Sequence, residues 1–377
     1  MRILYIYPFG PFFPVSSGAD IIATNHMEYF RKKGFQVDCI LFQNPQKTKY
    51  LDQFKAQYSF CNSIHLLDFP PIAFKFGELL FASNYLANSE PLKTLLRTPY
   101  DILFSNYAFT APISLAAKNT KLKVLETVDH LWEALAISNP ESNKNPIDEA
   151  TMKLIEFELY ELFEKIIFIN NEEMNNSPQN SKSSYAFIPP AWNLPVKDLS
   201  LSNSSSIDIL FIGSNHRPNI DGLDFFYKNV FLPFIRPMGF KLTVAGKVCD
   251  YWPVEDPRVE KIGFYKGPIQ SLYDSTKVVV IPILDGSGLS IKTLEAMAFG
   301  KAIVTTPKGA RGMKLENQPF LTINLKDHPE EFSKAVIDLL HSQDKRKILG
   351  SKALEHFKNE HSFEIYTQRM DNFLGLA

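Results

Sequence analysis

Lys292 and Glu295 are the two side chains of this sequence whose types and spacing point most clearly to chemistry. They fall on the same face of a short helical pattern. The loop before that helix contains Gly286 and Gly288. These glycines let a ligand approach the backbone, and the first N–H groups of the helix attract an anion. A phosphate that carries a polar group fits such a site. The other interpretation of this spacing is a structural turn followed by a surface ion pair.

Two β-branched runs flank this helix and position it. The first, at 278–281, reads VVVI and is typical of a buried parallel strand, and the second, at 303–306, reads IVTT. Gly300 ends the helix between them. Strand, glycine loop, helix and strand form a βαβ unit. Ligands of α/β sheets bind where such strands end.

Length and composition indicate a chain of two globular domains. Its 377 residues are more than one ordinary core holds and suit two domains of roughly 150–200 residues each. The formal net charge of −1 argues against nucleic acid as the main partner. The three cysteines are isolated and lack metal-ligand spacing, so we expect reduced thiols. Neither a signal peptide nor an apolar run of the ~18 residues that a membrane span needs is visible, and the cytoplasm is the expected compartment.

The same order of strand, polar loop and helix opens both halves of the chain. The first half starts with a strand at 3–7, a loop that ends in Ser17 and Gly18, and a helix at 19–33; the second starts with a strand at 207–212 and Gly213. A Ser- and Asn-rich linker at 198–206 separates them. The sequence therefore predicts an α/β fold with domains at 1–197 and 207–360, followed by a terminal helix at 361–377.

His130 is the candidate site residue of the first half. It follows Asp129 at the end of a predicted strand, where α/β sheets place ligands. The alternative is that Asp129 caps the next helix and His130 is partly exposed. Of the two, His130 is the better active-site candidate.

The stretch at 66–96 is rich in aromatic residues and proline. Its first interpretation is the packing of two helices on the core. Its second is an exposed apolar patch for an acceptor or for a membrane surface.

Metal binding is not expected. His356 and His361 stand five positions apart on a predicted helix, about 140° around its axis, so they cannot share a metal ion. No other His or Cys grouping has ligand spacing.

The window at 278–313 resembles the nucleotide-sugar signature of GT-B glycosyltransferases of family 4, the glycosyl transferases group 1. The residues that carry the resemblance are Pro282, Gly286, Ser287, Gly288, Leu289, Lys292, 294–298 (LEAMA), Gly300, Lys301, 304–306 (VTT) and 309–312 (GARG). Upstream, Gly213, Ser214, 218–222 (PNIDG) and Pro233 match a second pattern of this family. The resemblance implies two Rossmann-like domains facing across a cleft, with the helix at 361–377 crossing back to the acceptor-side domain at 1–197.

The resemblance also implies the members of the donor site. They are Gly18, Gly213, Lys247, Phe264, Tyr265, Gly286, Ser287, Gly288, Leu289, Lys292 and Glu295, with His130, Lys292 and Ser287 as the catalytic group. Judged from its position alone, Gly18 could also be a plain turn glycine. Lys247 could also be an ordinary surface lysine. The chain departs from the family at one point, because Ser287 stands where most members have the first Glu of a Glu-x7-Glu pair.

The implied function is transfer of a sugar from a nucleotide-diphosphate sugar, with UDP- or GDP-sugars as the expected donors, to an acceptor hydroxyl with retention. Glycans or lipid-linked acceptors of polysaccharide synthesis are the expected partners, with peripheral contact at the inner membrane face. A DxD pair is absent, so we expect no metal and no other cofactor. The alternatives are a GT-B sugar-nucleotide epimerase and a catalytically silent nucleotide-sugar-binding or scaffold protein.

Overall fold

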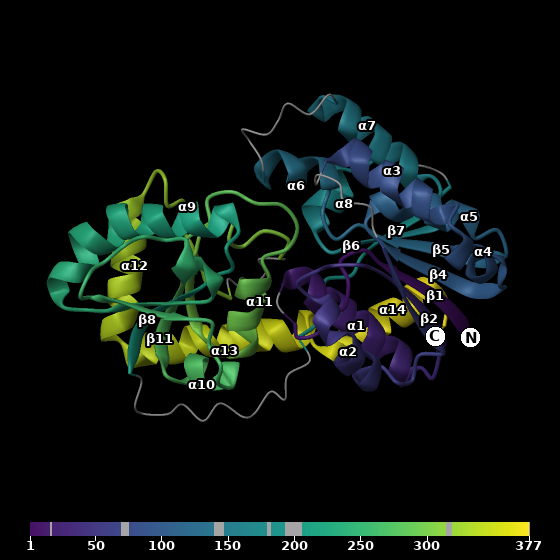
Figure 1. Cartoon of the computed structure of the whole chain (residues 1–377). Helices are drawn as coiled ribbons and strands as arrows, with labels where there is room; N and C mark the ends of the chain where they lie inside the picture. The colour runs from purple at the N-terminus through teal and green to yellow at the C-terminus, as the bar shows by residue number, and fades with distance from the viewer. Residues whose placement is uncertain are drawn as a thin grey trace. The chain divides into compact units, whose positions relative to one another are not determined.

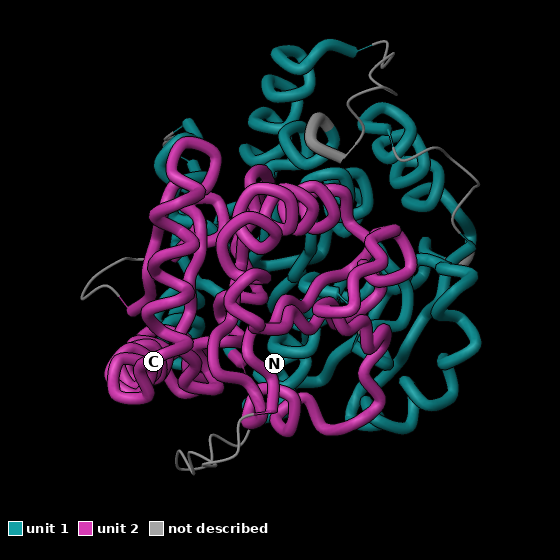
Figure 2. Tube along the Cα trace, turned by 90° about the vertical axis from the view of Figure 1, so that its left-hand side faces the viewer, with its two compact units in different colours: residues 1–191, 367–377 teal, residues 192–366 magenta. Residues whose placement is uncertain are grey.

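The chain forms two compact α/β units. The computed structural model describes residues 1–15, 17–68, 75–138, 147–178, 182–192, 206–313 and 319–376. Unit 1 comprises Met1–Ala191 and Thr367–Ala377, and unit 2 comprises Trp192–Tyr366 (Figure 2). The predicted linker at 198–206 lies outside the described residues except for Ser206.

Unit 1 is built on a seven-stranded sheet in the order β3-β2-β1-β4-β5-β6-β7. All of its strand pairs are parallel. The strands are β1 (Arg2–Tyr7), β2 (Gln36–Phe42), β3 (Ser63–Leu67), β4 (Tyr100–Asn106), β5 (Thr120–Glu126), β6 (Lys165–Phe168) and β7 (Ser184–Phe187). Apolar side chains on both faces of β1 are buried, as a central parallel strand requires.

Helices cover both faces of this sheet (Figure 1). They are α1 (Gly18–Lys32), α2 (Leu51–Gln57), α3 (Phe76–Ala87), α4 (Glu90–Arg97), α5 (Ala111–Ala116), α6 (Leu131–Ser138), α7 (Glu149–Tyr160) and α8 (Asn171–Asn176), with the short turns η1 (Thr48–Tyr50) and η2 (Ala108–Thr110). The end of α14 (Phe363–Leu374) packs on the same unit. There, Asp371 accepts hydrogen bonds from the Tyr29 hydroxyl at 2.8 Å and from Lys33 Nζ at 2.6 Å.

Unit 2 contains a six-stranded parallel sheet in the order β10-β9-β8-β11-β12-β13. Its strands are β8 (Ile207–Ile212), β9 (Leu242–Ala245), β10 (Val259–Gly263), β11 (Thr276–Ile281), β12 (Ala302–Thr305) and β13 (Leu321–Thr322). Its helices are α9 (Arg217–Phe226), η3 (Tyr227–Ile235), η4 (Arg236–Met238), η5 (Lys247–Asp250), α10 (Ile269–Asp274), α11 (Ile291–Ala298), α12 (Pro329–His341) and α13 (Gln343–Glu360). The prediction of two parallel-sheet α/β units is confirmed.

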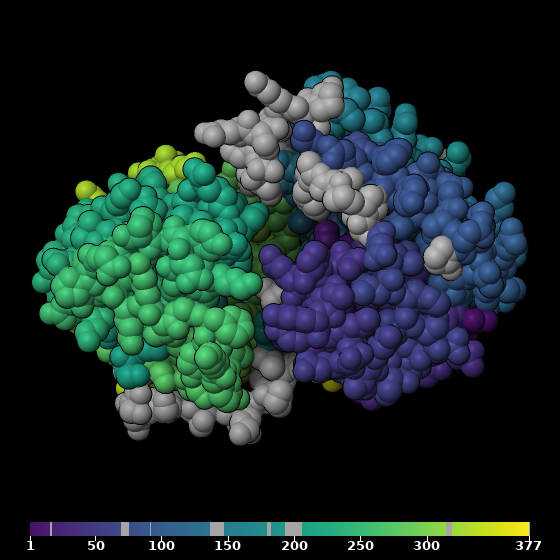
Figure 3. Space-filling model, viewed as in Figure 1, coloured from purple at the N-terminus to yellow at the C-terminus, as the bar shows by residue number. Residues whose placement is uncertain are grey.

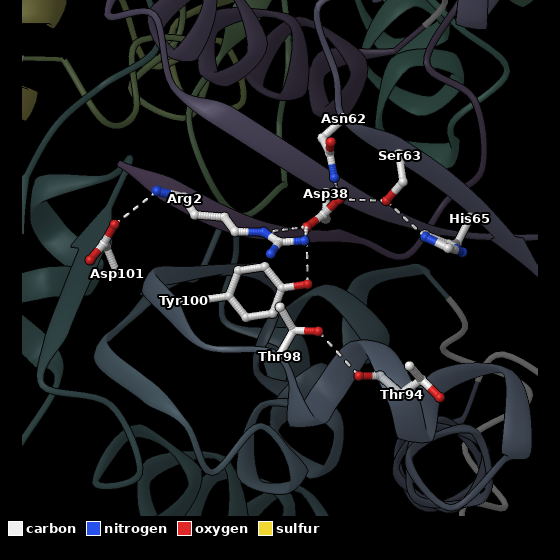
Figure 4. A network of polar contacts seen from close by, with 9 residues as sticks. All are labelled: Arg2, Asp38, Asn62, Ser63, His65, Thr94, Thr98, Tyr100 and Asp101. Carbon is white, nitrogen blue, oxygen red and sulfur yellow. Dashed lines mark hydrogen bonds and ion pairs between the residues drawn. The ribbon is translucent and has the colours of Figure 1, made fainter.

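A polar network stabilises unit 1 near the amino ends of its strands (Figure 4). The buried carboxylate of Asp38 accepts hydrogen bonds from Arg2 Nε at 3.0 Å and Nη2 at 2.8 Å, and from the Tyr100 hydroxyl at 3.1 Å. Asn62 and Ser63 donate to its other oxygen at 2.7 and 2.6 Å. Burial alone would raise the pKa of Asp38, but these donors outweigh it and lower the pKa. The network therefore ties β1, β2, β3 and β4 together at the edge opposite to the one where α/β sheets bind ligands.

Candidate functional site

The candidate site lies at the carboxyl edge of the sheet of unit 2. Because its strands are parallel, the loops after β8, β9, β10, β11 and β12 meet at this edge. Gly213 after β8 and Gly246 after β9 bring their backbones into direct contact, and a Cβ on Gly246 would lie 2.2 Å from the Gly213 oxygen. Gly246 also has a φ of +93°, which favours glycine. Backbone rather than side chains therefore forms this part of the edge.

The glycine loop after β11 leads directly into α11, as predicted. Gly286 and Gly288 both have positive φ, at +144° and +65°. Ser290 precedes the helix, and its hydroxyl lies 2.9 Å from that of Thr293. Thr293 in turn donates to the Gly309 oxygen at 2.5 Å. The amino end of α11, with its partial positive charge, is thus fixed against the turn that follows β12.

Lys292 points toward α9 rather than outward. Its Nζ donates to Asn219 Oδ1 at 2.6 Å, and Asn219 Nδ2 donates to the backbone and hydroxyl oxygens of Ser214 at 3.1 Å. Burial lowers the pKa of Lys292 to about 7, and the positive charge of Arg311 acts in the same direction, while Glu295 opposes it. An anion bound beside Lys292 would therefore be stabilised by a poorly hydrated ammonium group.

Glu295 is held by Tyr273, a residue of α10. Burial raises its pKa to about 7, whereas a hydrogen bond from the Tyr273 hydroxyl and the charge of Lys292 oppose the shift. Tyr273 is itself buried, and its ring stacks on Phe299 with centroids 4.6 Å apart. Lys292 and Glu295 are therefore two separately oriented groups, each with its own partner, rather than a solvated surface pair.

Two basic residues at this edge had no assigned role in the sequence analysis. Arg311, in the turn after β12, donates from Nε to the Ser287 oxygen at 2.7 Å and from Nη1 to the Lys308 oxygen at 2.8 Å. The pKa of His216, just before α9, is lowered by burial and then by the charges of Lys292 and Arg311. The only sequence signal for Arg311 was its place inside the GARG part of the family resemblance.

The remaining donor-site candidates of unit 2 lie along the same edge. Lys247 is exposed and begins η5 directly after Gly246. Phe264 follows β10 and is exposed, and Tyr265 lies beside Gly267, where a Cβ would come 2.8 Å from the Tyr265 hydroxyl. Leu289 is buried in the glycine loop. The structure thus brings Gly213, Lys247, Phe264, Tyr265, the 286–289 loop, Lys292 and Glu295 to one edge of one sheet.

Gly18 and His130 belong to unit 1. Gly18 is the first residue of α1, behind Ser17, whose hydroxyl accepts a hydrogen bond from the Asp20 N–H at 3.2 Å. Gly18 therefore begins a helix whose first turn is capped by Ser17. Its contact with a donor stays a prediction.

His130 is buried among aromatic side chains. Its Nε2 lies 3.0 Å from the Ser177 hydroxyl, and its ring is 6.0 Å from that of Trp132 and 5.7 Å from that of Phe157. Burial, with the nearby charge of Lys153, lowers the pKa of His130 to about 4. The imidazole is therefore neutral at pH 7, and its part in catalysis stays a prediction.

Metal binding and membrane spanning each need a recognisable feature among the described residues. Within them, no three His, Cys, Asp or Glu side chains gather as a metal-ligand set. None of the described helices has both the length and the apolar character needed to cross a membrane.

Comparison with known proteins identifies a family model that matches part of unit 2 and two relatives of the chain. Residues 206–342 match the family model for glycosyl transferases group 1. An uncharacterised protein from the cps region of Klebsiella pneumoniae is 22% identical over 336 residues, which cover 80% of this chain and 81% of that protein. An uncharacterised glycosyltransferase of Methanocaldococcus jannaschii is 37% identical over 81 residues, which cover 21% of this chain and 20% of that protein.

Solved structures resemble the chain over its whole length. Sucrose-phosphate synthase from Thermosynechococcus elongatus superposes with a TM-score of 0.73 at 14% identity, covering 98% of this chain and 97% of that one. HepE of Anabaena in complex with UDP-glucose gives 0.70 at 14% identity, and WaaG, a glycosyltransferase involved in lipopolysaccharide biosynthesis, gives 0.66 at 12%, each covering 100% of both chains. At these identities the likeness shows the fold, which is the GT-B fold predicted from the sequence.

Proposed function

We propose that this chain, which has the GT-B fold and matches the glycosyl transferases group 1 over residues 206–342, is a glycosyltransferase that transfers a sugar from a nucleotide-diphosphate sugar to an acceptor hydroxyl. The donor binds at the carboxyl edge of the sheet of unit 2. The observation that carries the proposal is the convergence of Lys292, Arg311 and the amino end of α11 at this edge, inside the stretch that matches the family.

The reaction needs groups that stabilise negative charge on the leaving diphosphate. The bond between sugar C1 and the phosphate oxygen breaks and its electron pair stays on the diphosphate. The oxygen of the acceptor hydroxyl bonds to C1, and its proton passes to the leaving diphosphate. Lys292 and the helix N–H groups face the charge that develops, in a site of low polarity where such interactions are strongest. Glu295, oriented by Tyr273, accepts hydrogen bonds from the ribose hydroxyls, as the family resemblance implies.

The finer features of the proposal rest on the relatives. A relative in a cps region and a structural neighbour in lipopolysaccharide biosynthesis support a glycan or lipid-linked acceptor. Structural neighbours bound to UDP and UDP-glucose support a UDP-sugar as the first donor to test. Retention of anomeric configuration and independence of metal ions follow from the resemblance to family 4.

A nucleotide-binding panel tests the donor site directly. We expect one class among the UDP-, GDP-, ADP- and TDP-sugars to raise the melting temperature of the wild-type chain, equally with Mg²⁺ and with EDTA. We expect Glu295→Gln to lose most of this stabilisation, because the amide no longer presents a carboxylate to the ribose. The shift in Tm grows with the logarithm of the ligand concentration above Kd, so each ligand is titrated over a range of concentrations.

The panel includes a matched carboxylate outside the site. Glu260→Gln changes an exposed glutamate of β10 in the same unit and should respond to nucleotides as the wild type does. A wild-type chain that no nucleotide stabilises would contradict the donor site. Stabilisation that only appears with Mg²⁺ would contradict metal independence.

We also propose that unit 1 makes a peripheral contact with membranes through α3. Phe81 and Tyr85 stand one helical turn apart there and are 67% and 60% exposed. The helix lies on the face of unit 1 seen in Figure 3, in blue. Next to it is an open hollow of about 540 Å³, lined by Phe81, Asn84, Tyr85, Asn88, Ser89 and Glu90. Two exposed aromatic rings on a helix with mostly apolar residues suit the boundary between headgroups and acyl chains.

Sedimentation with vesicles tests this contact. We expect the double variant Phe81→Ser, Tyr85→Ser to bind vesicles of phosphatidylglycerol and phosphatidylethanolamine at least about tenfold more weakly, since each buried ring contributes roughly 1.5–3 kcal/mol. Ile348→Ser removes an apolar side chain that is 61% exposed on α13 of unit 2 and serves as the control. Equal binding by the double variant and the wild type would show that α3 is not the contact.

A further inference from the structure

The turn after β12 is bound to the glycine loop at several points. Arg311 donates to the Ser287 oxygen at 2.7 Å, and the Ser290 N–H donates back to the Arg311 oxygen at 3.4 Å. The guanidinium group lies directly over Gly286, where a Cβ would come 3.0 Å from its Cζ atom. Gly286 also has a φ of +144°, so the loop needs glycine both for its conformation and for the space that Arg311 occupies.

The charge of Arg311 reaches the centre of the donor site. It lowers the pKa of Lys292 on α11, and it lowers that of His216 at the start of α9. The contacts of the guanidinium with Ser287 and Gly286 hold this charge in the loop that leads into α11. Arg311 thus has two properties at once: it fixes the loop, and it adds positive charge beside Lys292.

We propose that Arg311 is a positioning residue for the diphosphate of the donor: it holds the backbone of the 286–289 loop in place beside the phosphates and adds a positive charge to that of Lys292. This inference rests on the proposed donor site and deepens it. Arginine suits the task because its planar guanidinium donates in two fixed directions, here to Ser287 and to Lys308. A lysine keeps the charge but cannot make both bonds in this geometry.

Affinities for a nucleoside and for its diphosphate separate this role from general structural support. The probes are uridine and UDP, or the corresponding pair for the base that stabilises the wild type in the panel above, measured by calorimetric titration or by competition. We expect Arg311→Ala to weaken diphosphate binding about 10- to 100-fold, as loss of a charge-assisted interaction does. Nucleoside binding should stay within about twofold. The diphosphate affinity of Arg311→Lys should fall between those of the wild type and Arg311→Ala, because lysine restores the charge alone.

A second variant tests the same contact by changing Gly286 instead of Arg311. Gly286→Ala places a methyl group against the guanidinium and strains the loop, so we expect the same selective loss of diphosphate affinity. Arg258→Ala is the matched control, since Arg258 also donates to a backbone oxygen, that of Gly239 at 2.7 Å, but precedes β10 at the opposite edge of the sheet. It should leave both affinities unchanged.

The outcomes distinguish this inference from the proposed function. A wild-type chain that binds no nucleoside diphosphate overturns both. A wild type that binds, together with an Arg311→Ala variant of unchanged diphosphate affinity, overturns the inference alone. Equal losses for nucleoside and diphosphate also overturn it, because they indicate collapse of the loop rather than loss of phosphate recognition. Melting temperatures of all variants, measured without ligand, identify any that fail to fold, and Arg311→Lys then carries the test.

Discussion

Substitution of Lys292 by alanine is expected to lower kcat for sugar transfer by about 10²–10³-fold, the usual effect of removing one group that stabilises developing charge. The ammonium group is held by Asn219 at 2.6 Å, so it is already oriented before the donor binds. Its depressed pKa reports poor hydration, and an ammonium group in such a place gains more from an approaching anion than one in water does. Because charge on the diphosphate grows as the bond to the sugar breaks, the loss should appear mainly in kcat.

Steady-state kinetics with a saturating acceptor measure this effect. Lys292→Arg should keep part of the rate, since it keeps the charge but not the contact geometry with Asn219. Lys277→Ala is the control: this lysine of β11 pairs with Asp208 at 2.7 Å near the amino end of the strand, far along the sheet from the glycine loop. A Lys292→Ala enzyme with an unchanged kcat and a raised KM would mean that Lys292 binds the donor without stabilising the transition state.

Substitution of Asp38 by alanine is expected to lower the free energy of unfolding by about 3–5 kcal/mol, the range found when one partner of a buried ion pair is removed. The change leaves Tyr100, Asn62 and Ser63 without their acceptor and Arg2 without its partner, all near the amino ends of four strands (Figure 4). Denaturant unfolding measures the loss. The folded variant should keep its nucleotide affinity, because the network lies in unit 1 and the proposed site for the donor lies at the edge of the sheet of unit 2.

Titration of Asp38 should also make the free energy of unfolding depend on pH. The pKa of Asp38 is lower in the folded chain than its ordinary value of about 3.9 in an unfolded one. Its contribution is therefore complete above about pH 4 and is lost as the pH falls below that value toward the folded pKa. The stability difference between wild type and Asp38→Ala should narrow over this range. Asp101→Ala, which removes a more exposed partner of Lys121 in the same region, should change stability far less. A constant difference down to pH 2 would contradict the assignment.

The strands and the helix of the signature window could be predicted because their signals are local. VVVI and IVTT have the β-branched composition of buried strands, and both form neighbouring parallel strands, β11 and β12. Lys292 and Glu295 were found because a helix puts residues three apart on one face. Each of these features depends only on residues that are close together in the sequence.

Arg311, Asn219 and Tyr273 escaped prediction because their importance comes from contacts across the sheet. Asn219 meets Lys292 from 73 positions away, and Arg311 meets Ser287 from 24 positions away. Such pairs depend on the order of strands, which a single sequence does not reveal. His130 was predicted as a site residue because it follows a strand. The sequence did not show that the side chain is buried, because the aromatic residues around it come from α7 and β6.

The division of unit 1 between the two ends of the chain has a consequence for biosynthesis. Residues 192–366 form unit 2 without interruption, so this unit can fold on the ribosome as soon as it has emerged. Unit 1 begins before unit 2 in the chain but includes residues 367–377. Tyr29 and Lys33 can therefore bond Asp371 only after those residues have been synthesised. Unit 1, whose synthesis begins first, is thus completed after unit 2. A chain cut after Tyr366 would therefore contain all of unit 2 but only part of unit 1.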